Sequence, residues 1–323
     1  MRQLLRRIVF YIVALWASVT INFIIPRLAP GNPAQALMAR FQGKLNPDAL
    51  HALEIQFGIT NESLWTQYWD YIGNLLHGNL GLSITYFPTS VASVIAQDLP
   101  WTLVLVGVSV VISFVLGTLI GMLIAWRRGS LADSVLPPFM ILFSAVPYFW
   151  LALILLYVLG FKLNLFPLSG GYNTNVSPGL NGDFLASAIG HAILPALTIV
   201  ISSIAGWMLG MRNTMITTLT EDYVLMAQAK GLPEREVMYA YAARNAILPN
   251  ITGFALALGF VVGGALFTEM VFSYPGIGYA LLQAVQNSDY PLVQGIFLII
   301  AIAVLAANFL ADLVNTALDP RTR

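Results

Sequence analysis

The sequence predicts an all-α polytopic membrane protein, and three observations carry that prediction. Hydrophobic residues make up 58% of the 323 residues and charged residues only 9%, whereas a typical soluble domain has about 25% charged residues. The mean hydropathy is +0.77. The apolar residues also gather in long continuous runs, while a membrane β-barrel has short segments of alternating hydrophobicity. A chain of this composition does not dissolve as a monomer without large exposed apolar patches.

Six apolar segments are long enough to cross a bilayer, which takes about 20 mostly apolar residues. They are residues 8–25, 101–125, 136–160, 188–209, 251–272 and 292–314. The first follows basic residues as in a signal peptide, but no small-residue cleavage site comes next. The chain continues instead into Pro26, Arg27 and Pro30. We therefore expect residues 1–26 to form an uncleaved N-terminal transmembrane helix.

The distribution of Lys and Arg predicts the orientation of these spans. Six spans place both termini on one side, and most basic residues fall on that side: Arg2, Arg6, Arg7, Arg127, Arg128, Arg212, Lys230, Arg235, Arg244, Arg321 and Arg323. The other side has Arg27, Arg40, Lys44 and Lys162. Because basic residues favour the cytoplasmic side, we expect both termini and the loop 212–250 to be cytoplasmic. The loops 27–100 and 161–187 then face outward.

Within the outward loop 27–100, residues 63–77 have the periodicity of an amphipathic helix. The apolar side chains at helical spacing are Leu64, Tyr68, Tyr71, Ile72 and Leu75. One interpretation is a helix that lies on the bilayer surface or covers the bundle. The other is a docking surface for an external partner, and the pattern alone leaves both open.

Residues 221–250 form a long polar, helix-forming segment between two strongly apolar spans. A protein that only packs against lipid would keep such a connection short. Glu221 and Asp222 suit a helix N-terminus, where acidic groups oppose the positive end of the dipole. Gly231 can end this short helix and Pro233 can open the next one. The pattern predicts a helix, a glycine turn and a second helix over residues 234–247.

Two small residues on the first helix, Ala227 and Ala229, would let a partner surface approach closely. We interpret the loop as a docking platform for a soluble partner, which moves with the partner and transmits that movement to the spans. The alternative is an ordinary interfacial hairpin with no partner.

The same loop resembles the EAA loop of permease subunits in ATP-binding-cassette (ABC) importers. An alanine, a glycine four residues later and a Leu-Pro pair mark that loop, and Ala227, Gly231 and Leu248-Pro249 match them. The leading Glu-Ala pair is replaced by Leu225-Met226, and the spacing from Gly231 to the Leu-Pro pair is longer. Both departures resemble the oligopeptide/dipeptide permease subfamily, whose loop is close to A-x-A-K-G-L.

Further motifs, in the order expected for that subfamily, extend the resemblance over nearly the whole chain. They are RLAPGNP at 27–33, LHGNLG at 76–81, PYFW at 147–150, FPLSG at 166–170, FSYPGIG at 272–278, DYPLVQG at 289–295 and LDPR at 318–321. Each motif alone is weak, but their shared order makes the resemblance specific.

The resemblance implies a type I ABC importer permease fold, with a core over residues 101–323, in a bacterial or archaeal inner membrane. It implies four partners besides membrane lipid: a second homologous permease subunit, two ATP-binding subunits and an extracytoplasmic solute-binding protein. Transport would proceed by alternating access driven by the ATPases. The residues expected to couple this chain to the ATPases are Tyr223, Ala227, Ala229, Lys230, Gly231 and Leu232.

The chain has no P-loop of the form G-x-x-x-x-G-K-[ST] and no cysteine, and its three histidines are scattered. We therefore expect no catalysis and no cofactor or metal in this chain, with ATP and Mg²⁺ bound by partner subunits. The zero formal net charge gives no indication of nucleic-acid binding. A stand-alone carrier or channel would need intramembrane ionisable groups, for which Glu269 and Asp312, both near span ends, are the candidates. A non-transporting membrane scaffold is a third hypothesis.

The substrate is less determined than the function. The resembling subfamily is associated with peptides, nickel chelates and oligosaccharides. No charged residue falls at mid-span, so we expect a neutral or zwitterionic solute, with a slight tilt toward oligosaccharides. Glycines at 206, 210, 259, 263 and 264 are expected either to pack helices closely or to give a pliable pathway. Pro147 and Pro195 are expected to kink or end helices.

Overall fold

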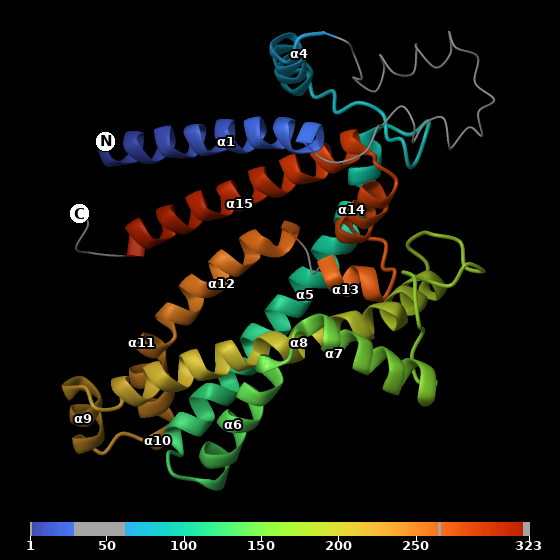
Figure 1. Ribbon diagram of the computed structural model, residues 1–323. Helices are drawn as coiled ribbons and strands as arrows, with labels where there is room; N and C mark the ends of the chain where they lie inside the picture. Colours follow the sequence, from blue (N-terminus) through green and yellow to red (C-terminus); the bar gives the residue numbers. More distant parts are fainter. Residues whose placement is uncertain (1, 29–61, 264–265, 319–323) are drawn as a thin grey trace. The chain divides into compact units, whose positions relative to one another are not determined.

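The computed structural model describes residues 2–28, 62–263 and 266–318, and these ranges are helical with connecting loops and no strand (Figure 1). The motif at 27–33 and the end of the motif at 318–321 lie largely outside the described residues. The chain divides into two compact units. Unit 1 comprises residues 1–102, 262–266 and 275–309, and unit 2 comprises residues 103–261, 267–274 and 310–323.

Four helices in the described ranges are long and apolar enough to cross a membrane. They are α1 (Arg2–Leu28), α5 (Val91–Trp126), α8 (Gly182–Thr218) and α15 (Tyr290–Leu318). Two further pairs of helices pass the same test only if each bent pair is taken as one span. The structure thus has four to six candidate spans, and it places helices at all six predicted segments.

The predicted span over residues 136–160 is a pair of helices with a sharp bend, and the expectation that Pro147 kinks or ends a helix is confirmed. Helix α6 (Leu131–Ala145) ends at Val146, and α7 (Tyr148–Leu155) begins after Pro147 and continues as a π-helix (Leu156–Lys162). The two halves meet at 94°. A proline disfavours the helical conformation of the residue before it, and Val146 is extended, with ψ of 125°. By contrast, Pro195 lies inside the unbroken α8 and does not end a helix.

The predicted span over residues 251–272 is also interrupted. Helix α12 (Leu248–Phe260) passes into a 3₁₀ turn (Val261–Gly263), and α13 (Leu266–Val271) follows after two residues outside the described ranges. The 3₁₀ turn contains Gly263, and glycine is a poor residue in a helix interior, whereas α12 continues through Gly259. Glu269 of α13 is completely buried. The Asp312 side chain lies outside the described set.

The predicted amphipathic helix is confirmed as α4 (Leu64–Leu76), and Ser63 caps it by accepting the amide hydrogen of Thr66. In unit 1 it packs on the end of α1. The hydroxyls of Tyr68 and Thr20 lie 2.9 Å apart, and the Asn22 amide donates to the hydroxyl of Tyr71 at 3.3 Å. Burial raises the pKa of Tyr71 to about 12, so this phenol stays neutral. Of the five predicted residues, Tyr68 and Tyr71 make this contact, and Ile72 and Leu75 are half-buried.

The fifth, Leu64, does not face it, because its side chain is 64% exposed. Trp65 and Trp69 are exposed on the same helix, and their rings meet edge to face at 5.7 Å. Helix α4 therefore covers the end of α1 with one face and presents aromatic side chains on another.

Asp289 fixes the start of α15 in unit 1. Its carboxylate is fully buried and accepts hydrogen bonds from the hydroxyl of Ser83, from the amide of Thr85 at 2.8 Å and from the amide of Leu292 at 3.1 Å. The last of these bonds caps α15, and the first two hold the loop that precedes α5. The pKa of Tyr86 in that loop is raised, mainly by burial of its phenol. Electrostatic interactions with Asp98, Tyr279 and Asp289, in decreasing order, raise it further.

Candidate functional site

The polar segment 221–247, called here the docking hairpin, forms a helix, a turn and a second helical leg, as predicted (Figure 1). Helix α9 (Asp222–Ala229) is the first leg. The second leg starts at α10 (Glu234–Glu236), continues as a π-helix (Val237–Ala243) and ends in α11 (Arg244–Ala246). A bend of 50° separates this leg from α12.

Gly231 makes the turn between the two legs. Its φ of +74° lies in the left-handed region, which glycine adopts without the steric cost that a β-carbon brings. Its amide donates to the carbonyl of Gln228 at 2.9 Å, which closes the end of α9. Pro233 follows as the N-cap of α10. The predicted roles of both residues in the turn are confirmed.

One side of the docking hairpin is buried in the main core of unit 2. Val224, Ala227 and Val237 of the hairpin are almost inaccessible, and they join a cluster with side chains of α5 and α8. The α5 and α8 members of that cluster are Met122, Ala125, Met211 and Met215. The hairpin is thus packed directly onto the ends of two candidate spans, and the flexible methionine side chains fill the space between them.

Large apolar side chains on both legs of the docking hairpin are exposed. Leu225 is 49% exposed, Met226 is 60% exposed and Tyr239 is 51% exposed. Contiguous exposed apolar residues on a polar segment mark protein interaction sites. The sequence alone did not single out these three residues as exposed. The signal was present at Leu225-Met226, where two large apolar residues stand in an otherwise polar stretch.

The six residues predicted to couple to an ATPase fall into two groups. Tyr223, Ala229, Lys230 and Gly231 are exposed, while Leu232 is half-buried against the core and Ala227 is only 2% exposed. The small size of Ala227 predicts that a partner approaches it closely. In the structure a partner cannot reach it directly, because its methyl group already packs within the core. The hydroxyl of Tyr223 accepts a hydrogen bond from the Asn245 amide at 2.8 Å, which joins the two legs of the hairpin.

Asn250 ties the base of the docking hairpin to both neighbouring spans. Its side chain is buried, and its amide donates to the hydroxyl of Thr118 in α5 at 3.1 Å and to the carbonyl of Trp207 in α8 at 3.0 Å. The backbone of α8 is close here, because a β-carbon at Gly210 would lie 2.8 Å from the Asn250 amide oxygen. The predicted close packing at Gly210 is confirmed, whereas Gly206 faces open space.

Aromatic rings lie beside this polar contact. The rings of Phe114 and Phe254 stack with their centroids 4.4 Å apart, and Trp207 meets Phe114 edge to face at 5.4 Å. All three side chains are half-buried. Helices α5, α8 and α12 are therefore joined by both polar and aromatic contacts just beyond the bend that leads out of the docking hairpin.

An ion pair holds the turn between α5 and α6 against α8. Both Nε and Nη2 of Arg212 contact Oδ1 of Asp133, at 2.7 and 2.6 Å, and the amide of Gly129 donates to Oδ2 at 3.0 Å. The Asp133 side chain is only 8% exposed. The carboxylate thus has a partner for each oxygen, as a buried charge requires.

Replacing Arg212 by methionine is expected to lower the stability of unit 2 by about 3–5 kcal/mol, because it leaves a buried carboxylate without its counter-charge. The thermal midpoint of the purified protein in detergent measures this. Asp133→Asn together with Arg212→Met should recover much of the loss, since no charge then remains buried. Arg235→Gln, at an exposed position of the hairpin, is the control. An Arg212→Met midpoint equal to that of the control would contradict the expectation.

Comparison with known proteins agrees with this architecture. The model of the family described as the binding-protein-dependent transport system inner membrane component matches residues 117–323. The di/tripeptide transport system permease protein DppB of Pseudomonas aeruginosa is 34% identical, over 98% of this chain and 97% of the relative. The dipeptide transport system permease protein DppB of Lactococcus lactis is 31% identical over 100% and 99%. The oligopeptide transport system permease protein AppB of Bacillus subtilis is 32% identical over 98% of each chain.

The matched region contains the C-terminal part of α5, all of the docking hairpin and every later helix. The relatives extend the match over α1 and the loop 27–100 as well. The apolar helices, the family match and the relatives all agree with a multi-pass protein of the cell inner membrane. This chain belongs to the family of inner membrane components of binding-protein-dependent transport systems, and it is a permease subunit of an ABC importer.

Proposed function

We propose that this chain pairs with a second, homologous permease subunit to import short peptides, which an external solute-binding protein delivers and two ATPase subunits drive. The observation that carries the proposal is the two-sided docking hairpin. One side packs on α5 and α8, and the other exposes Leu225, Met226 and Tyr239. A segment built in this way can bind a soluble subunit and pass its movement into the membrane.

The coupling mechanism follows from the contacts of the hairpin. Closure of the ATPases on ATP would displace the exposed side of α9. Because a close-packed core transmits displacement, the cluster around Val224 and Ala227 would move the ends of α5 and α8 with it. Asn250 adds a second link, since its amide holds α5 and α8 to the start of α12. ATP binding shifts the equilibrium between inward-open and outward-open states by as much as the affinity of the complex for ATP differs between these two states.

The proposed topology has six spans, with each bent pair counted as one span and both termini in the cytoplasm. The excess of Lys and Arg on the side of the termini supports this orientation. It places the docking hairpin where soluble ATPases are found, and it places α4 outside, where a solute-binding protein arrives. Tyr223, Ala229, Lys230 and Gly231 would lie at the ATPase contact, with Leu232 and Ala227 supporting it from beneath.

The proposed substrate class is short peptides. The names of the relatives refer to dipeptides, di/tripeptides and oligopeptides. A peptide zwitterion also agrees with predicted spans that carry no charged residue at mid-span. These names outweigh the slight tilt toward oligosaccharides, which rested on scarcity of charge alone.

The substrate is tested with the full complex, reconstituted in proteoliposomes with its solute-binding protein. ATP hydrolysis is measured with dipeptides, longer peptides and β-linked oligosaccharides in parallel. We expect stimulation by peptides only. Stimulation by oligosaccharides only would contradict peptides as the substrate class, but it would still support an ATP-driven importer. Peptide uptake that proceeds without ATP or the ATPases would support the alternative hypothesis of a stand-alone carrier.

The docking face is tested by cross-linking, for which the absence of native cysteine is an advantage. Met226→Cys in the complex is expected to cross-link to a cysteine placed in the docking cleft of an ATPase. Leu180→Cys is the matched control, because Leu180 is also exposed but lies in the loop predicted to face outward. Cross-linking from the control alone would reverse the proposed orientation.

A further inference from the structure

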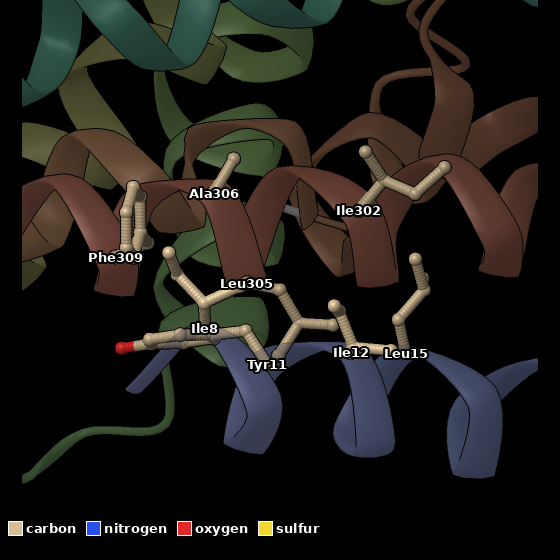
Figure 2. A pocket seen from close by; sticks show the side chains of 8 residues that line it. All are labelled: Ile8, Tyr11, Ile12, Leu15, Ile302, Leu305, Ala306 and Phe309. Carbon is tan, nitrogen blue, oxygen red and sulfur yellow. The ribbon is translucent and has the colours of Figure 1, made fainter. Parts of the chain in front are cut away.

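An apolar groove lies between α1 and α15 in unit 1. Figure 2 shows that Ile8, Tyr11, Ile12 and Leu15 line it from α1, and Ile302, Leu305, Ala306 and Phe309 line it from α15. Its volume is about 410 Å³. On both helices the lining residues recur at intervals of three and four, which is one helical face. The only polar side-chain atom among them is the Tyr11 hydroxyl, which Figure 2 shows directed toward the end where Phe309 lies.

The groove lies near one end of the two helices, where Ile8 of α1 and Phe309 of α15 are among its lining residues. Near their other end, the Asn22 amide donates to the carbonyl of Gln294 at 2.7 Å, and the Gln294 amide donates to the carbonyl of Asn22 at 3.2 Å. From this pair of bonds the helices run antiparallel to the contact between the rings of Tyr11 and Phe309, whose centroids are 5.4 Å apart. This ring contact belongs to the groove itself, because Tyr11 and Phe309 are both lining residues.

Water is a poor occupant of this space. A bound water needs two to four polar partners, and the lining supplies a single hydroxyl. All eight lining residues lie within the two candidate spans Arg6–Ile25 and Tyr290–Phe309. Ile12 and Ile302 are partly exposed at the groove, at 61% and 44%. The natural occupant of an open apolar groove at this depth is hydrocarbon.

One end of the groove is cationic. Arg6 is exposed and Arg7 is half-buried, and both directly precede the first lining residue, Ile8. Arg7 lies four residues before Tyr11, on the same face of α1 as the groove. The planar guanidinium group matches the geometry of phosphate oxygens. Basic residues at the membrane end of a groove between helices are typical of sites for anionic lipid headgroups.

We propose that this groove binds one acyl chain of an anionic phospholipid from the leaflet that faces the N-terminus, with the lipid phosphate on Arg6 and Arg7. A transmembrane helix is a less suitable occupant, because a helix with its side chains is about 10–12 Å wide, while the two walls are joined by the Asn22–Gln294 hydrogen bonds and by the Tyr11–Phe309 ring contact. A partner helix would cover the opening and leave the space beneath it unfilled. The proposal rests on charge and shape, and it is independent of the transported substrate.

The test uses the intact complex, purified in detergent and examined by native mass spectrometry with phosphatidylglycerol or phosphatidylcholine of identical acyl chains. We expect bound phosphatidylglycerol to be retained over phosphatidylcholine. Arg6→Gln and Arg7→Gln should each reduce the preference roughly fivefold, the factor for losing one juxtamembrane basic contact of about 1 kcal/mol. Equal retention of both lipids by the unaltered complex would overturn the role of the arginines.

Groove-filling variants test the acyl-chain site itself. Ala306→Phe places a ring in the groove and should abolish retention of both lipids. Val9→Phe is the matched control, because Val9 is exposed on α1 but does not line the groove. Retention unchanged in Ala306→Phe would refute the site. Cross-linking of Ile302→Cys to the second permease subunit would show instead that a protein helix covers the groove, which would also overturn the proposal. Unchanged co-purification of the ATPases confirms that each variant folds.

Discussion

Replacing Gly231 by proline is expected to abolish ATP-driven uptake while the chain remains in the membrane. The φ of Gly231 is +74°, and the proline ring fixes φ near −65°. Proline also lacks the amide that donates to Gln228 at the end of α9. These two losses together cost several kcal/mol. The turn therefore reorganises, and α9 no longer presents its exposed side to the ATPase. Uptake and peptide-stimulated ATP hydrolysis in proteoliposomes measure the effect.

Two further substitutions separate backbone conformation from side-chain contact. A β-carbon at Gly231 would have no atom within 4 Å, so space is available for any side chain. Asparagine tolerates the left-handed region, so Gly231→Asn should retain most of the uptake. A valine in the left-handed region has a steric cost of at least about 1–2 kcal/mol. The uptake by Gly231→Val should therefore lie between that of Gly231→Asn and that of Gly231→Pro. Full peptide-stimulated uptake by Gly231→Pro would show that this turn plays no part in coupling. Loss in Gly231→Asn equal to that in Gly231→Pro would point to a direct partner contact instead.

The spans found correctly from the sequence are those whose signal is local. Residues 8–25 and 292–314 each fall within one long helix, because length and apolar composition suffice to specify it. The segment 136–160 has the same composition, but a hydropathy average hides the effect of Pro147 on one backbone dihedral. The proline was recognised, yet the 94° turn also depends on how α6 and α7 pack against α8, which no local pattern contains.

The docking hairpin shows the same division between local and tertiary information. Gly231 and Pro233 specify the turn, and the sequence predicted it. The sequence did not specify which face of α9 is buried, because both faces carry apolar residues. Ala227 is inside and Leu225 outside only because Met211 and Met215 of α8 receive the face that contains Val224.

Long-range polar contacts lay beyond the sequence analysis altogether. Asp133 and Arg212 are 79 residues apart, and Asn250 and Thr118 are 132 residues apart. Nothing in the spacing of such pairs indicates contact. They become visible only when the fold brings their helices together.

One missed feature of the core had a recognisable sequence signal. Gly117 and Gly121 of α5 have the spacing of the G-x-x-x-G motif, through which membrane helices approach closely. Both face α8. A β-carbon at Gly117 would lie 2.8 Å from the carbonyl oxygen of Ile204, and one at Gly121 would overlap the carbonyl oxygen of Met208. The obstructing atoms belong to the backbone, so they cannot rotate aside as a side chain can.

Replacing Gly121 by valine is therefore expected to force α5 and α8 apart, at a cost of about 1–3 kcal/mol or more. The same displacement would open the adjoining cluster of Met122, Met211 and Met215, on which the docking hairpin is packed. The variant should thus lose both thermal stability and coupled transport. The thermal midpoint in detergent and uptake in proteoliposomes measure the two losses.

Gly206→Val is the matched control, because a β-carbon at Gly206 of α8 would meet no atom within 4 Å. It introduces the same side chain at another glycine of the same helix pair and should leave the thermal midpoint nearly unchanged. Equal midpoints for Gly121→Val and Gly206→Val would mean that α5 and α8 do not touch through their backbones at Gly121. A lower midpoint for Gly121→Val with normal coupling would mean that the hairpin transmits movement without the methionine cluster, which leaves Asn250 as the link to α5 and α8.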